Sequence, residues 1–135
     1  DLQISYCAAT RDGQIAPDVV GVKICGAYPE GSLGNGHAHW ISRKVVEAYL
    51  AFDPVATVID FRGMSYTWGN TLLKVFEDYQ QIAGDAPHLR LVVSHLCEPA
   101  LRSLLGESRF DYLHHSLTDA FEAAQRDVRE WLDSP

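Results

Sequence analysis

Cysteine is scarce in this sequence, and none of it occurs in a CxxC spacing. Cys7, Cys25 and Cys97 form an odd set, which argues against both a disulfide framework and a zinc site made of cysteines alone. Long apolar runs are also missing, since no stretch approaches the roughly 20 residues of a membrane-spanning helix. The sequence therefore predicts a protein of a reducing compartment, the cytoplasm by default, with no membrane contact.

Basic side chains are few relative to acidic ones. Eleven Lys and Arg residues stand against 18 Asp and Glu residues, which gives a formal charge of −7. This charge repels phosphate backbones and anionic lipids and favours a basic partner. We therefore expect no nucleic acid as a ligand, and we expect any protein partner to be basic.

The sequence also lacks internal repeats, low-complexity stretches and long linkers. Its 135 residues and 47% apolar content suit a single globular core. We therefore interpret residues 1–135 as one domain.

Apolar periodicity predicts the first elements. Alternating residues indicate strands at Leu2–Tyr6 and Val20–Ile24, with a break at Asp12-Gly13 between them. Three glycines within Gly31–Gly36 are typical of a flexible loop. Helical spacing then begins at Trp40 and predicts a helix that stops at Asp53-Pro54.

The segment Val55–Phe61 is a short, nearly continuous apolar run, which is typical of a strand covered on both faces. We expect this strand to break at Gly63 and to lead through the loop Tyr66–Asn70 into a helix. That helix has apolar residues at helical spacing from Leu72 to Ile82.

The remaining elements alternate between strand and helix. A buried strand is expected at Leu89–Ser94, a short helix opened by Pro99, a short strand at Phe110–His114 and a final helix capped by Ser116. The order ββαβαβαβα predicts an α/β sandwich with about five strands in a mixed, mostly parallel sheet and about four helices.

Several of these segments together resemble the STAS domain, the small fold of anti-sigma-factor antagonists and of the cytoplasmic ends of sulfate transporters. The resemblance covers roughly Trp40 to Gln125 and rests on mostly apolar segments. They are Val58–Tyr66, Leu72-Leu73, Leu91–Val93, Leu104-Leu105, Phe110–Leu113 and Ser116–Ala120. It implies a STAS-like sandwich and a regulatory protein-binding role.

The sequence departs from that family at the loop after the central strand. Antagonists carry an acidic residue there, followed by a phosphorylatable serine at the start of the helix. Those positions fall on Trp68 and on Gly69 or Asn70. The resemblance therefore implies that the phosphorylation switch is lost, and hydroxyls nearby, such as Thr67, are interpreted as ordinary turn residues.

The same loop is the predicted partner-binding site, because α/β sheets place ligands at the carboxyl ends of their parallel strands. Tyr66 and Trp68 are aromatic residues of the kind that dominate interfaces. Gly69 and Asn70 could present backbone amides to an anion, although a simple helix cap at Asn70 is the favoured interpretation. The predicted site consists of Ser65, Tyr66, Thr67, Trp68, Gly69 and Asn70.

Histidine and cysteine suggest a weaker, alternative site. His37 and His39 form an H-x-H pair, and His95 and Cys97 form an H-x-C pair. In extended segments such alternate residues point the same way, as metal ligands would. Nothing in the sequence brings the two pairs together, so we expect neither a metal nor another cofactor.

No catalytic residues are predicted. Asp60 and Arg62 are interpreted as a structural ion pair beside the apolar strand. Ser94 and His95 are adjacent in a strand and would point to opposite faces, so they cannot form a nucleophile and base pair.

The sequence thus favours a non-enzymatic protein-binding module that acts by docking or occlusion. Small size and net acidity suit an immunity-type inhibitor of a bacterial toxin, because opposite charge accelerates capture of a basic enzyme. A STAS-type regulatory adaptor is one alternative, and a small hydrolase or metal-dependent enzyme is another. The sequence leaves the oligomeric state open.

Overall fold

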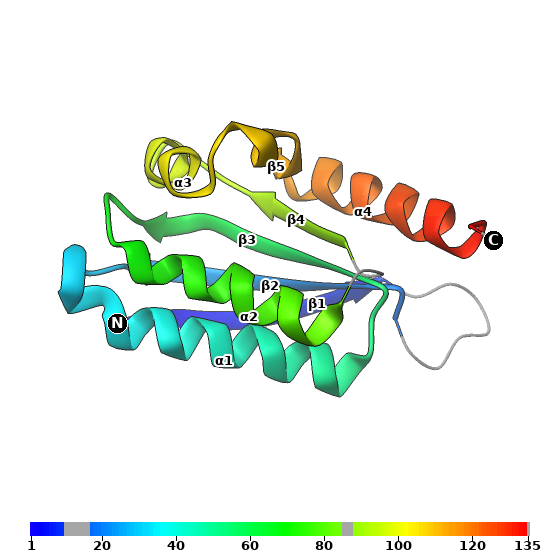
Figure 1. Cartoon of the computed structure of the whole chain (residues 1–135), viewed down its shortest axis with the longest axis horizontal. Coiled ribbons are helices and arrows are strands. Elements are labelled where there is room, and N and C mark those ends of the chain that lie inside the picture. Colours follow the sequence, from blue (N-terminus) through cyan, green and yellow to red (C-terminus); the bar gives the residue numbers. More distant parts are fainter. Residues whose placement is uncertain (10–16, 85–87, 135) are drawn as a thin grey trace.

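The computed structural model describes residues 1–9, 17–84 and 88–134. Within these ranges a five-stranded sheet has the strand order β1-β2-β3-β4-β5, and Figure 1 shows its strands with their helices. β1 pairs antiparallel with β2, and every other neighbouring pair is parallel. The strands are β1 (Gln3–Ala9), β2 (Val19–Ala27), β3 (Ala56–Ser65), β4 (His88–Val92) and β5 (Leu113–His114).

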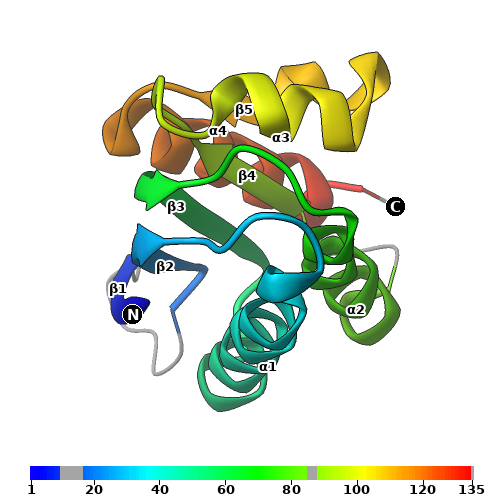
Figure 2. The same ribbon diagram turned by 90° about the vertical axis from the view of Figure 1, so that its left-hand side faces the viewer.

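Four α-helices and three short 3₁₀ segments complete the described part of the chain. They are η1 (Gly31–Gly34), α1 (Asn35–Phe52), η2 (Asn70–Leu72), α2 (Leu73–Ala83), α3 (Glu98–Leu105), η3 (Glu107–Tyr112) and α4 (Leu117–Leu132). α1 and α2 cover one face of the sheet, and α4 packs against β3 and β4 on the other (Figure 2). The predicted mixed α/β sandwich is confirmed.

Alternation along β3 shows why the central strand is apolar on both faces. Ile59 and Phe61 belong to the core beneath α1 and α2, whereas Ala56 and Val58 pack in the smaller core beneath α4. Successive side chains of a strand point to opposite faces. A strand that lies between two helical layers therefore has no solvent side, which explains the continuous apolar run.

Gly63 does not break β3, contrary to the expectation from sequence. The strand continues to Ser65, and Gly63 pairs with Cys25 of β2, just beyond a register shift that begins at Lys23. A Cβ atom on Gly63 would lie 2.7 Å from the Cys25 Sγ. The glycine therefore allows the cysteine side chain of the neighbouring strand to approach closely.

The expected loop Gly31–Gly36 is also wrong, because this segment is helical. It forms η1 and the first residues of α1, so that α1 begins at Asn35 rather than at Trp40. Gly34 lies under the ring of Tyr28, where a Cβ atom would come within 2.4 Å of a ring carbon. Gly31 and Gly34 therefore serve close packing, which a local composition rule does not distinguish from flexibility.

The other boundaries differ in smaller ways. The expected strand at Phe110–His114 is mostly η3, which leads into the two-residue β5. Ser116 does cap α4, since its Oγ accepts a hydrogen bond from the Asp119 amide. The predicted turn at Asp12-Gly13 lies outside the described residues. No helix in the described ranges is long and apolar enough to cross a membrane.

Candidate functional site

The carboxyl ends of β2, β3 and β4 lie at the same edge of the sheet, because these three strands are parallel. Figure 2 looks toward this edge and shows the connections that follow the three strands. The first runs from Tyr28 into η1, the second from Tyr66 to η2, and the third from Val93 to α3. The predicted site Ser65–Asn70 is therefore the middle one of three neighbouring loops.

Backbone hydrogen bonds tie these three loops together. The bonds are Tyr28 N to Ser65 O at 2.9 Å, Gly31 N to Trp68 O at 3.2 Å and Tyr66 N to Leu96 O at 3.1 Å. Side chains add a further link, because the Thr71 hydroxyl donates to Asn35 Oδ1 at 2.7 Å. Amides and carbonyls that would otherwise face solvent are thus paired between loops, and each loop fixes its neighbour.

Tyr66 supports the middle loop from inside. Its side chain is buried, its hydroxyl donates to the Gly69 carbonyl at 2.9 Å, and its ring meets that of Tyr28 edge to face at 5.1 Å. Burial, with a smaller contribution from Tyr28, raises the pKa of Tyr66 to about 12. Tyr66 therefore positions the loop backbone and does not present its ring at the surface.

Trp68 is the exposed aromatic residue of the middle loop. Its side chain is 58% exposed, and its indole Nε1 donates to Glu30 Oε2 at 3.1 Å. The ring lies against Gly31, where a Cβ atom would come within 2.5 Å of Trp68 Cη2. The first loop, through Glu30 and Gly31, thus holds the Trp68 ring in place, while much of the ring surface faces solvent.

The other predicted residues differ in accessibility. Thr67 and Asn70 are exposed, Ser65 is half-buried, and Gly69 is buried with φ of +145°. The expected Asn70 helix cap is wrong, because Asn70 is the first residue of η2 and neither Gly69 before η2 nor Leu72 before α2 makes a side-chain cap bond. A 3₁₀ turn replaces the cap and leads the chain into α2.

The structure adds residues that the sequence analysis did not select. Leu33 of the first loop is 78% exposed, and Leu96 of the third loop is 43% exposed. Both residues belong to loops that follow parallel strands, and this position in the chain is the sequence signal that could have selected them. Neither residue stands out in an apolar pattern. We define the three-loop surface by its exposed side chains, Glu30, Leu33, Thr67, Trp68, Asn70 and Leu96.

The four candidate metal ligands do not lie in extended segments with each pair pointing the same way, as the sequence pattern suggested. His37 and His39 lie on α1, where residues two apart do not share a face. His95 is exposed, whereas Cys97 is buried and its thiol donates to the Phe61 carbonyl at 3.4 Å. Across the described ranges, no group of three or more His, Cys, Asp or Glu residues could hold a metal ion.

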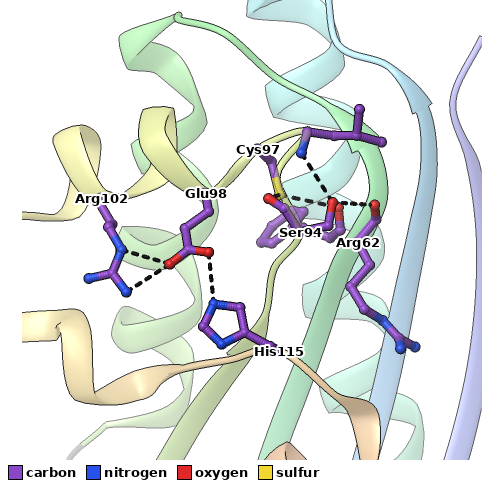
Figure 3. Close-up of polar contacts among 8 residues, drawn as sticks. Arg62, Ser94, Cys97, Glu98, Arg102 and His115 are labelled. Atoms are coloured by element: carbon purple, nitrogen blue, oxygen red, sulfur yellow. Dashed lines mark hydrogen bonds and ion pairs between the residues drawn. The ribbon is translucent and has the colours of Figure 1, made fainter.

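Polar side chains beside the third loop already have partners within the protein, as Figure 3 shows. The Ser94 hydroxyl donates to the Arg62 carbonyl at 2.8 Å. Glu98 Oε1 lies 2.7 Å from His115 Nε2, and Glu98 Oε2 accepts from Arg102 Nε at 2.8 Å. Although partial burial opposes it, hydrogen bonds from Arg102 and His115 lower the pKa of Glu98. This arrangement joins α3 to the β5–α4 connection.

The predicted ion pair of Asp60 and Arg62 is present. Arg62 donates to both carboxylate oxygens, from Nε at 3.0 Å and from Nη2 at 2.8 Å, and its backbone amide adds a third bond at 3.0 Å. The Asp60 side chain is 2% exposed. The two residues are therefore engaged in structure at the sheet and are not available as an acid and base pair.

A second surface feature lies between α1 and α2. This groove has a volume of about 300 Å³ and contains Asp78, which accepts a 2.6 Å bond from the Ser42 hydroxyl and pairs with Lys74 at 3.1 Å. The Ser42 hydrogen bond is the main cause that lowers the pKa of Asp78. The polar groups at the centre of this groove, Ser42, Lys74 and Asp78, are thus paired with each other. The three-loop surface is therefore the stronger candidate for recognition.

Together, the mixed five-stranded sheet, the helices on both faces and the loops at the carboxyl edge define a STAS-like fold. The sequence-based resemblance is confirmed at the level of fold by solved structures. A crystal structure of an anti-sigma factor antagonist from Mycobacterium paratuberculosis matches with a TM-score of 0.61 and 20% identity, over 91% of this chain and 95% of that one.

A second solved structure has the same architecture. The Bacillus cell fate determinant SpoIIAA, in its phosphorylated form, matches with a TM-score of 0.52 and 11% identity, over 91% of this chain and 98% of that one. No protein-family model matches the sequence, and no curated protein matches it. At these identities the likeness shows the fold alone.

Proposed function

We propose that this protein is a non-enzymatic binding module that docks on another protein through its three-loop surface. The observation that carries the proposal is Trp68, a largely exposed aromatic side chain held against Gly31 and bonded to Glu30. Exposed aromatic residues in fixed positions are the usual energetic centres of protein interfaces. Leu33 and Leu96 would add apolar contact area on either side of it.

Within this class, we favour a regulatory adaptor over an inhibitor of a toxin. The fold neighbours include an anti-sigma factor antagonist and SpoIIAA, and both support a regulatory role. The positions that carry the acidic residue and the phosphorylatable serine in antagonists are Trp68 and Gly69 or Asn70 in this chain. Adaptor binding would therefore depend on the presence of the partner rather than on phosphorylation at these positions.

The partner is proposed to be basic. The chain carries a net charge of −7, and Glu30 adds a carboxylate to the three-loop surface itself. Complementary charge mainly accelerates association and weakens as salt screens it. An association rate that falls with ionic strength would support this part of the proposal, and a rate independent of salt would contradict it.

A capture experiment in the native host tests the proposal. The immobilised protein is compared with Trp68→Ala and with Trp131→Ala, which removes a tryptophan that is 41% exposed on α4. We expect Trp68→Ala to lose a partner that Trp131→Ala retains. If every captured protein binds all three forms equally, the three-loop surface is not the docking site.

The identity of the captured partner separates the two uses. A regulatory protein supports the adaptor, whereas a basic toxin supports the immunity-type inhibitor. Purified partner and titration calorimetry then give the affinity of each variant. Truncation of a central interface tryptophan is expected to weaken binding by about 2 kcal/mol or more.

A further inference from the structure

β1 lies at one border of the sheet formed by the described residues. It is the first strand in the sheet order, so β2 occupies one of its edges, and no strand in the described ranges occupies the other. Figure 2 shows β1 at the border of the sheet, far from β5. The backbone amides and carbonyls along such an edge can pair with a further strand.

The features that normally protect a free edge are missing from β1. Gln3–Ala9 contains no charged residue and no proline, and its pairing with β2 runs through seven consecutive residues without a register shift. Natural edge strands are usually short, charged, bulged or interrupted by proline. The opposite border shows such protection, because β5 has only two residues.

An exposed aromatic pair lies beside this edge. Tyr6, in the middle of β1, is 43% exposed, and its ring centroid lies 6.4 Å from that of Phe52, which is 36% exposed at the end of α1. Tyr6 therefore points to the α1 face of the sheet. A strand added to β1 would cover part of both rings and bury apolar surface together with its backbone hydrogen bonds.

We propose that this edge pairs with the β1 strand of a second copy of the chain, antiparallel and centred on Tyr6. The two sheets would then form one continuous sheet about a two-fold axis. In this register Tyr6 faces Tyr6 of the other copy, Ser5 faces Cys7, and Gln3 faces Ala9. All these side chains are uncharged, so two copies with a net charge of −7 meet along a segment without like-charge opposition.

A second copy suits this edge better than a basic partner strand does. An uncharged strand offers no carboxylate to a basic segment, whereas it matches itself residue by residue under two-fold symmetry. The dimer would also place its two three-loop surfaces at opposite strand ends of the continuous sheet, since the strands of the two copies run in opposite directions. Pairing through β1 is thus compatible with docking, although it does not depend on it.

Sedimentation velocity over a range of concentrations tests the dimer with the purified chain alone. One strand and two aromatic side chains per copy form a small contact, so we expect a concentration-dependent equilibrium between monomer and dimer. Tyr6→Lys places two like charges opposite each other on the axis and should raise the dimer Kd by about tenfold or more. Tyr6→Phe should retain the dimer.

Gln125→Lys adds the same charge at an exposed position of α4 and controls for the change in net charge. Circular dichroism checks that each variant is folded. A wild type that stays monomeric at every concentration would overturn the proposal. A folded Tyr6→Lys variant that dimerises like Gln125→Lys would overturn it as well.

Disulfide trapping tests the register. Ser5→Cys places a thiol opposite Cys7 of the second copy, so mild oxidation should give a covalent dimer on a non-reducing gel. In the wild type Cys7 faces Ser5, and the same oxidation should leave the chain monomeric on the gel. Trapping of the wild type without trapping of Ser5→Cys would contradict pairing centred on Tyr6.

Discussion

Replacement of Gly31 by alanine tests how the three-loop surface is built. Gly31 has φ of +60°, and a Cβ atom there would lie 2.5 Å from Trp68 Cη2 and 2.7 Å from Trp68 Cζ2. The left-handed conformation costs a residue other than glycine about 1 kcal/mol. Displacement of the indole would also weaken its hydrogen bond to Glu30, which contributes about 0.5 to 1 kcal/mol.

We therefore expect Gly31→Ala to lower the free energy of unfolding by about 1 to 2 kcal/mol, even though alanine restricts the unfolded chain slightly. Urea denaturation followed by far-ultraviolet circular dichroism measures this change. Gly36→Ala is the matched control, because Gly36 lies in α1 and a Cβ atom there would meet no heavy atom within 4 Å. That variant should be more stable than the wild type by about 0.5 to 1 kcal/mol.

Tryptophan fluorescence gives a local measure of the same substitution. In a background with Trp40→Phe and Trp131→Phe, Trp68 is the sole tryptophan. Its emission should shift to longer wavelength in Gly31→Ala, because the ring would leave its contact with the first loop. Unchanged emission together with unchanged stability would refute the idea that Gly31 positions Trp68.

Two further predictions concern the sheet and its core. Arg62→Ala leaves the buried Asp60 carboxylate without its side-chain donors, so denaturation should show that the free energy of unfolding falls by about 2 to 3 kcal/mol. Lys44→Ala removes a surface pair with Glu47 in which the Lys44 side chain is half-buried, and it should cost less than about 1 kcal/mol. Equal losses would contradict the buried ion pair. Burial raises the pKa of Tyr79 to about 12, above the value of about 10 in the unfolded chain. The contribution of the neutral Tyr79 phenol to the free energy of unfolding is complete below pH 10 and is lost as the pH rises toward 12. The free energy of unfolding of the wild type should therefore fall over this window. In Tyr79→Phe the fall should be smaller by roughly 2 kcal/mol. Parallel stability curves for Tyr79→Phe and the wild type would contradict this assignment.

Local patterns were sufficient for most of the architecture. Alternation predicted β1 and β2, the apolar run Val55–Phe61 predicted the central strand, and Ser116 marked the start of α4. These signals work because each depends on residues close together in the sequence. The right order of strands and helices then restricted the possible folds to a few.

Local patterns failed where the deciding partner lies far away in the sequence. Gly63 continues β3 because Cys25 of β2 approaches it, and Gly34 is helical beneath the ring of Tyr28. Tyr66 is buried because it packs against Tyr28, which follows another strand. The exposure of Leu33 and Leu96 likewise depends on how three loops meet, which periodicity does not report.

The hydrogen bonds between the three loops have a consequence for binding kinetics. A surface whose backbone is fixed before contact loses little conformational entropy when a partner docks. If recognition requires a conformational change, the partner would then be the protein that changes. The association rate would be limited by diffusion and by electrostatic steering, and not by the ordering of a loop. Weakening a link between the first two loops, as Gly31→Ala is expected to do through the hydrogen bond from Trp68 to Glu30, should slow productive association even where the buried contact area of the final complex is unchanged.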